Sequence, residues 1–87
     1  MSDWAWEYDP DGYGDTLPPG VRAAVEHIAA DLAVANSMVY LDGAAYEGQS
    51  PPVRREYGTT TDGHAFMVTY VTDVRGERVV VVSVSVH

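Results

Sequence analysis

The chain has 87 residues, enough for one small domain with a single hydrophobic core. Its formal net charge is −8, because thirteen acidic residues outnumber five basic ones, all of them arginine. Such an acidic chain is a poor match for phosphate backbones and suits basic partners, and it contains no cysteine, which excludes disulfides, thiolate metal sites and cysteine nucleophiles.

The charge is unevenly distributed along the chain. Residues 1–50 carry nine acids and one arginine, whereas residues 51–87 carry four of each. The N-terminal segment lacks the basic region and apolar run of a signal peptide, and no stretch reaches the length of a membrane span. We therefore expect one cytoplasmic domain over residues 1–87 with no membrane contact.

The first predicted element is a short strand over 4–8, in which Trp4, Trp6 and Tyr8 share a face. The next segment, D-P-D-G-Y-G-D, resembles a calcium loop only in part. Tyr13 and Gly20 occupy positions that need oxygen ligands, so we expect a solvated turn and no metal.

One amphipathic helix is predicted to begin at Pro19, a residue suited to the first helical position. Asn36 and Ser37 can end it, and we expect His27 to lie on its flank, partly exposed. The segment 38–41 fits either a helical extension or an extended piece. The predicted buried stripe recurs at spacings of four and three residues and comprises Val21, Val25, Ile28, Leu32 and Ala35.

After a loop over 42–52, three strands are predicted at 53–57, 64–72 and 78–87, the last two joined by a hairpin around Gly76. The final run, R-V-V-V-V-S-V-S-V-H, is the strongest strand signal in the chain. Simple alternation places Val80, Val82, Val84 and Val86 on one of its faces. The predicted fold class is therefore α+β: an N-terminal strand, one main helix, then a three-stranded antiparallel meander packed against the helix.

These segments carry motifs of a known family. The string V-R-R-E-Y-G…H-A-F-M-V-T-Y-V-T-D-V-R-G-E-R-V-V-V-V-S-V-S-V-H resembles the C-terminal half of RelE/ParE-superfamily toxins, and Y-D-P-D-G-Y-G-D-T-L-P-P-G-V-R-A-A-V resembles their N-terminal part. The resemblance implies a toxin neutralised by a cognate antitoxin. RelE-like members cut ribosome-bound mRNA, ParE-like members target gyrase, and the chemistry lies on the sheet face opposite the helices.

The resemblance suggests a catalytic set for RNA cleavage. Such cleavage needs a proton acceptor, a proton donor and a cation facing the phosphate. Arg54 would bind the phosphate, His87 would act as general acid or base, and Tyr70 would position the substrate. Arg55 and His64 would assist in substrate binding, and no cofactor is required. This hypothesis predicts that Arg54, Tyr70 and His87 converge on the sheet face away from the helix.

The sequence departs from the family pattern in two places. Glu56 stands where the family has a second arginine, and Met67 stands where it has an arginine three residues before the strand tyrosine. The alternative is a catalytically inactive interaction module that binds a basic protein or a second copy of itself. That alternative rests on the acidic first half, on an open sheet edge and on five aromatic residues expected to be exposed: Trp4, Trp6, Tyr13, Tyr40 and Tyr46.

Overall fold

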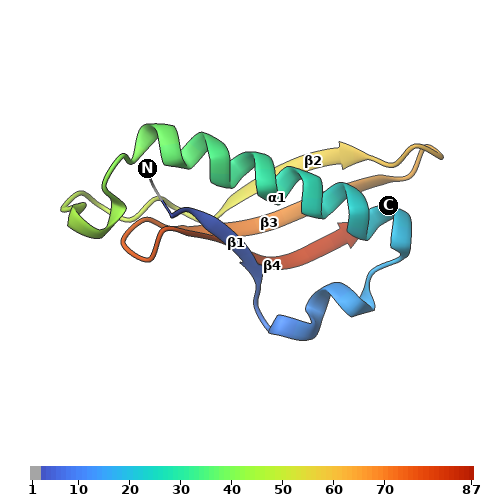
Figure 1. Cartoon of the computed structure of the whole chain (residues 1–87). Coiled ribbons are helices and arrows are strands. Elements are labelled where there is room, and N and C mark those ends of the chain that lie inside the picture. The colour runs from blue at the N-terminus through green and yellow to red at the C-terminus, as the bar shows by residue number, and fades with distance from the viewer. Residues whose placement is uncertain (1–2) are drawn as a thin grey trace.

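The computed structural model describes residues 3–87 and has principal dimensions of 41 × 21 × 19 Å. The predicted α+β order of one strand, one main helix and a three-stranded meander is confirmed (Figure 1). In chain order the elements are β1 (Ala5–Tyr8), the 3-10 helix η1 (Asp11–Thr16), α1 (Pro19–Val39), the 3-10 turn η2 (Gly43–Ala45), β2 (Arg54–Thr59), β3 (Ala65–Asp73) and β4 (Arg78–Val86).

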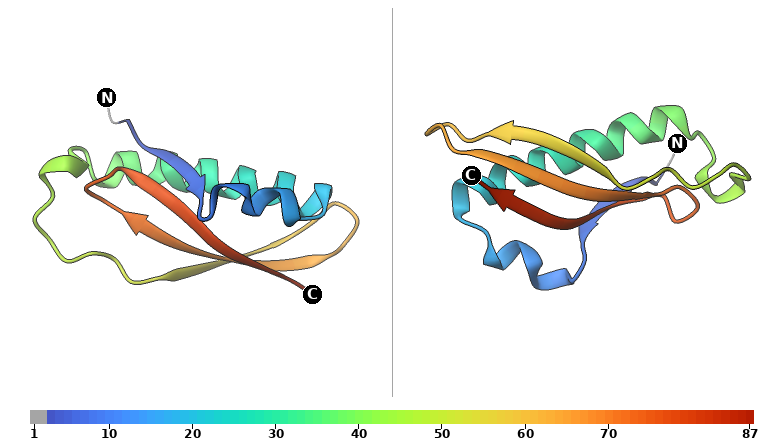
Figure 2. Two further views of the ribbon diagram at one scale, coloured as in Figure 1. Left: turned by 90° about the horizontal axis from the view of Figure 1, so that it is seen from below. Right: turned by 180° about the vertical axis from the view of Figure 1, so that it is seen from behind.

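The strands form one sheet in the order β1-β4-β3-β2. The pairs β2–β3 and β3–β4 are antiparallel, whereas β1 lies parallel to β4 because the long α1 connection carries the chain back along the sheet. Figure 2 shows two layers, with α1 across one face of the sheet. Within residues 3–87 no helix or loop covers the other face, and β1 and β2 form the two edges.

The helix α1 begins at Pro19, as predicted, but the predicted buried stripe is only partly right. Ile28 and Leu32 are half-buried and Ala35 is exposed. Alanines at the centre of the contact let the helix approach the sheet closely, which moves the larger side chains to its flank. The residues of α1 that are fully buried against the sheet are Val21, Val25, Ala29 and Ala33.

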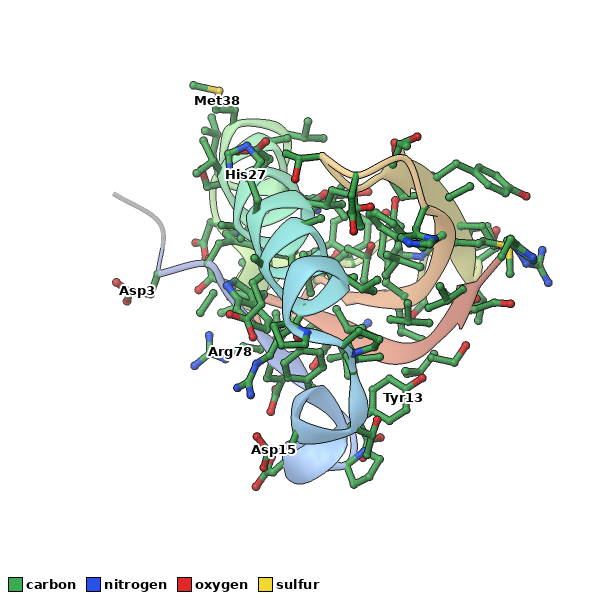
Figure 3. The ribbon with its side chains drawn as sticks, turned by 90° about the vertical axis from the view of Figure 1, so that its right-hand side faces the viewer. Asp3, Tyr13, Asp15, His27, Met38 and Arg78 are labelled. Carbon is green, nitrogen blue, oxygen red and sulfur yellow. The ribbon has the colours of Figure 1, made fainter. Side chains whose placement is uncertain are left out.

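The helix continues to Val39, so the helical extension that the sequence allowed for residues 38–41 is present at its start, and Asn36 and Ser37 do not end the helix. Asn36 Nδ2 donates to the Leu32 carbonyl at 2.9 Å, and Ser37 Oγ donates to the Val34 carbonyl at 2.6 Å. Both side chains therefore bond back along the helix instead of terminating it. As a consequence the last turn carries apolar residues that face solvent, and Met38 projects from the end of α1 away from the sheet (Figure 3).

A bulge in β4 corrects the predicted valine face. Thr69 pairs with Ser83 and Tyr70 pairs with Val81, so Val82 is an extra residue without a partner in β3. The valines on the helix side are Val79, Val81, Val84 and Val86, not the strictly alternating set. Without this extra residue Ser83 and Ser85 would face the core, so the bulge keeps valines inside and serines outside.

The short strand β1 leaves the second half of β4 without a neighbour on that side, since its last pair joins Tyr8 to Val81. Tyr13 of η1 fills the gap: its hydroxyl accepts the Val84 N–H at 2.7 Å and donates to the Val84 carbonyl at 3.3 Å (Figure 3). The segment predicted as a solvated turn is therefore a 3-10 helix that protects a strand edge.

A polar network ties η1, β1 and α1 together. The Tyr8 hydroxyl donates to Glu26 Oε2 at 3.0 Å, and Arg22 Nε donates to the same oxygen at 2.9 Å. The second arm of Arg22 binds Asp15 Oδ1 at 2.9 Å. Burial, reinforced by the hydrogen bond and charge of Glu26, raises the pKa of Tyr8 to about 12.

Stability should therefore fall in strongly alkaline solution. The pKa of Tyr8 is raised in the folded state, so its contribution is intact below the unfolded value of about 10 and is lost as the pH rises through about 12. The full loss is about 2–3 kcal/mol. Urea denaturation at about pH 9 and about pH 11.5 measures most of this loss, about 2 kcal/mol, and Tyr8→Phe should lose less. Tyr70, whose pKa burial also raises, is kept in both proteins, so equal losses would contradict this assignment.

Within residues 3–87 no helix combines the length and apolar composition needed to cross a bilayer.

Candidate functional site

The structure separates the three residues predicted to form a catalytic site. Tyr70 is only 5% exposed and lies in the core beneath α1. Arg54 pairs with Tyr70 across β2 and β3 and so shares the helix-facing side. His87 follows Val86, which faces the helix, so His87 points to the opposite side and is exposed. The predicted convergence of Arg54, Tyr70 and His87 on the face away from the helix is therefore wrong.

The surroundings of Tyr70 are those of a structural side chain. Burial raises the pKa of its hydroxyl, and the charge of Glu56 acts in the same direction. Arg54 acts in the opposite direction and lowers the pKa of Tyr70 through its charge and a hydrogen bond. The phenol thus stays neutral, and its ring packs with Ala33 and Val79 beneath the helix with little surface exposed.

The uncovered face of the sheet, which we call the open sheet face, carries Arg55 and His87. Its acidic side chains Glu7 and Asp73 are balanced by Arg55 and Arg78, so it is close to neutral. The strand register also places on it the side chains of Tyr57, Met67, Thr69, Val71, Val80, Ser83 and Ser85. Two of the five predicted site residues therefore remain available together on an accessible surface.

His64 lies in a third place, at the end of the sheet near the start of α1. It helps to line a cleft of about 340 Å³ together with Asp62, Pro19 and Gly20. Hydrogen bonding from Thr60 lowers the pKa of the Asp62 carboxyl, which keeps it ionised. A phosphate in this cleft would therefore meet a negative charge, so the geometry does not favour the predicted substrate-binding role of His64.

The aromatic residues predicted to be exposed are half-buried and packed. Trp4 stacks on Tyr40 with 5.9 Å between ring centroids, and Tyr46 meets Tyr40 edge-on at 5.1 Å. Trp6 packs edge-on against Tyr8 at 5.2 Å. The large apolar side chains that are exposed are different ones: Val34, Met38, Val39, Leu41, Val53, Tyr57 and Val86.

A groove of about 290 Å³ runs between the helix and the edge strand, and we call it the α1–β2 groove. It is lined by Ile28, Asp31, Leu32 and Ala35 from α1 and by Glu56 and Tyr57 from β2. The groove exists because α1 packs over β1, β3 and β4, while β2 places no side chain in the core.

The sequence also contains a signal for this groove. The stripe through Ile28, Leu32 and Ala35 was assigned to the core, although Ala29 and Ala33 form an equally regular row suited to close packing. Two apolar rows on one helix indicate more apolar surface than one sheet face covers. Within residues 3–87 no three His, Asp or Glu side chains gather to hold a metal ion.

Neither protein-family models, nor curated proteins, nor solved structures include a match to this chain.

Proposed function

We propose that this chain is a small toxin-type α+β protein of the bacterial cytoplasm that acts through protein contacts and not by catalysis. The observation that carries the proposal is the separation of Arg54 and Tyr70, on the helix side, from His87, on the open sheet face. Cleavage of RNA by its own 2′-hydroxyl requires acid, base and cation within reach of one phosphate. Groups on opposite faces of a sheet do not meet that requirement.

The charge of the molecule supports the same conclusion. Binding to a nucleic acid gains affinity with each phosphate that a cation neutralises, but the formal net charge here is −8. Several of the arginines are also occupied: Arg22 binds Asp15 and Glu26, and Arg75 Nε donates to the Tyr46 carbonyl at 3.0 Å. A basic protein therefore suits the negative charge of this molecule better than RNA does.

One observation favours a second function, a toxin-type endoribonuclease that uses the open sheet face. Arg55, Tyr57 and His87 share that face, and the row that joins Tyr57 to Met67 and Ser85 lies next to His87. In this version Arg55 takes the phosphate-binding role that was first assigned to Arg54, and His87 keeps the acid–base role. Tyr70 has no part in it.

Induced expression in a bacterial host separates the two functions. The wild-type chain and the double variant Arg55→Ala/His87→Ala are compared for amino-acid incorporation and for new mRNA ends. We expect equal incorporation and no new ends for both proteins, because neither is a nuclease. Soluble expression of each must be confirmed by gel filtration. A loss of translation in the wild type that the double variant restores would establish the ribonuclease instead.

A further inference from the structure

We infer that the α1–β2 groove is the docking site for a basic, amphipathic helix of a partner protein, an inference that rests on the proposed function. The floor of the groove is apolar and has helical spacing. Ile28, Leu32 and Ala35 line the groove at intervals of four and three residues, and Val39 continues the row four residues further on, at the end of α1. This row lies beside the buried row of valines and alanines that contacts the sheet, so part of its apolar surface is left uncovered by the sheet.

Exposure increases along this row toward the end of the helix. Ile28 and Leu32 are half-buried, Ala35 is exposed, and Val39 is 70% exposed. Apolar residues in a row of this length are those that a second helix covers when the ridges of one helix fill the grooves of the other.

Charge identifies the kind of helix that fits. Asp31 lines the groove from α1 and Glu56 lines it from β2, so a helix in the groove would have a carboxylate on each side. Arginine or lysine flanking an apolar row would pair with both. Asp31 Oδ2 lies 3.4 Å from His27 Nε2, and both side chains are on the exposed surface of the helix.

The same charges argue against a second copy of the chain as the occupant. Two copies would each bring a formal net charge of −8, and a symmetric contact through the groove would bring Asp31 and Glu56 of one copy toward those of the other. Like charges facing each other across an interface disfavour it. A strand added to the edge of β2 would leave the apolar row of α1 uncovered, so a helix is the better occupant.

The test uses the full chain and a fluorescent helical peptide with leucines at i, i+3, i+4 and i+7 and with arginines and lysines elsewhere. A twin peptide carries glutamates at the basic positions. We expect saturable anisotropy changes for the basic peptide only. The variant Asp31→Asn/Glu56→Gln should bind about tenfold more weakly, as expected from the loss of two exposed charge pairs.

A matched control removes the same charge elsewhere. Asp42→Asn/Glu47→Gln changes two exposed acids outside the groove and should alter affinity by less than about twofold. Chemical-shift changes on binding should centre on Ile28, Leu32 and Glu56. Equal weakening by both double variants, shifts on the open sheet face, or no saturable binding would each overturn the inference. None of these binding results tests whether the chain cleaves mRNA. The proposed function, action without catalysis, is therefore contradicted only by the expression experiment.

Discussion

Replacing Phe66 with alanine is expected to lower the free energy of unfolding by about 3–5 kcal/mol. Phe66 in β3 is 1% exposed and is the largest fully buried side chain in the described part of the chain. It belongs to the cluster in which Val25 of α1 meets Val68 and Val81 of the sheet. Since native proteins are stable by only about 5–15 kcal/mol, this loss should leave much of the variant unfolded. Urea denaturation followed by tryptophan fluorescence measures the change.

Gly58 of β2 probes the same ring from the neighbouring strand. It pairs directly with Phe66, and a Cβ at this position would lie 2.5 Å from Phe66 Cζ. Gly58→Ala should therefore cost about 1–3 kcal/mol, and clearly less in a Phe66→Leu background, where the ring is gone. Gly12→Ala is the matched control, because no atom lies within 4 Å of its added Cβ. If the Gly58 and Phe66 effects simply add, the proposed contact between them does not limit packing.

The order and class of the elements could be predicted from the sequence because their signals are local. Pro19 marks the start of the helix, and the valine run and the turn before Arg78 mark the last strand. Alternation alone also places Phe66, Val68 and Tyr70 on one face of their strand, although it does not say that this face is the one beneath the helix. Asn36 shows where a local signal misleads, because the same side chain can end a helix or bond back within it.

The candidate site could not be predicted in the same way, because it depends on how the strands are aligned with one another. Alternation groups Arg54 with Glu56, but only the pairing of Arg54 with Tyr70 shows that this group faces the helix. The bulge at Val82 is likewise a property of two strands together and reverses the faces of everything after it. His87 reaches the open sheet face through that reversal.

The sequence pattern around Tyr70 indicates a structural side chain. Tyr70 shares its face with Phe66 and Val68, and a tyrosine at the end of an apolar row is a core residue more readily than a catalytic one. The resemblance to toxin motifs gave it a catalytic role that the strand pattern alone did not. The two interpretations of Tyr70 lead to opposite experimental results, and substitution at this position separates them.

Tyr70→Ala is expected to lower the free energy of unfolding by about 3–5 kcal/mol, whereas Tyr70→Phe should cost only about 1 kcal/mol. The alanine variant leaves a cavity between Ala33 and Val79, beneath the helix. The phenylalanine variant keeps the ring and loses only the hydroxyl that interacts with Arg54. Urea denaturation of both variants beside the wild type gives the two values.

A catalytic tyrosine would show the reverse ranking in function. Removing a reacting or substrate-binding hydroxyl abolishes activity while the fold survives, so Tyr70→Phe would be folded and inactive. For a structural tyrosine, Tyr70→Phe should bind the basic helical peptide with wild-type affinity, because Tyr70 lies under the helix and does not line the α1–β2 groove. Tyr57→Phe serves as the exposed control, because Tyr57 is 70% exposed and its side chain points to the open sheet face. A folded Tyr70→Phe protein that loses binding or toxicity would return Tyr70 to the functional site.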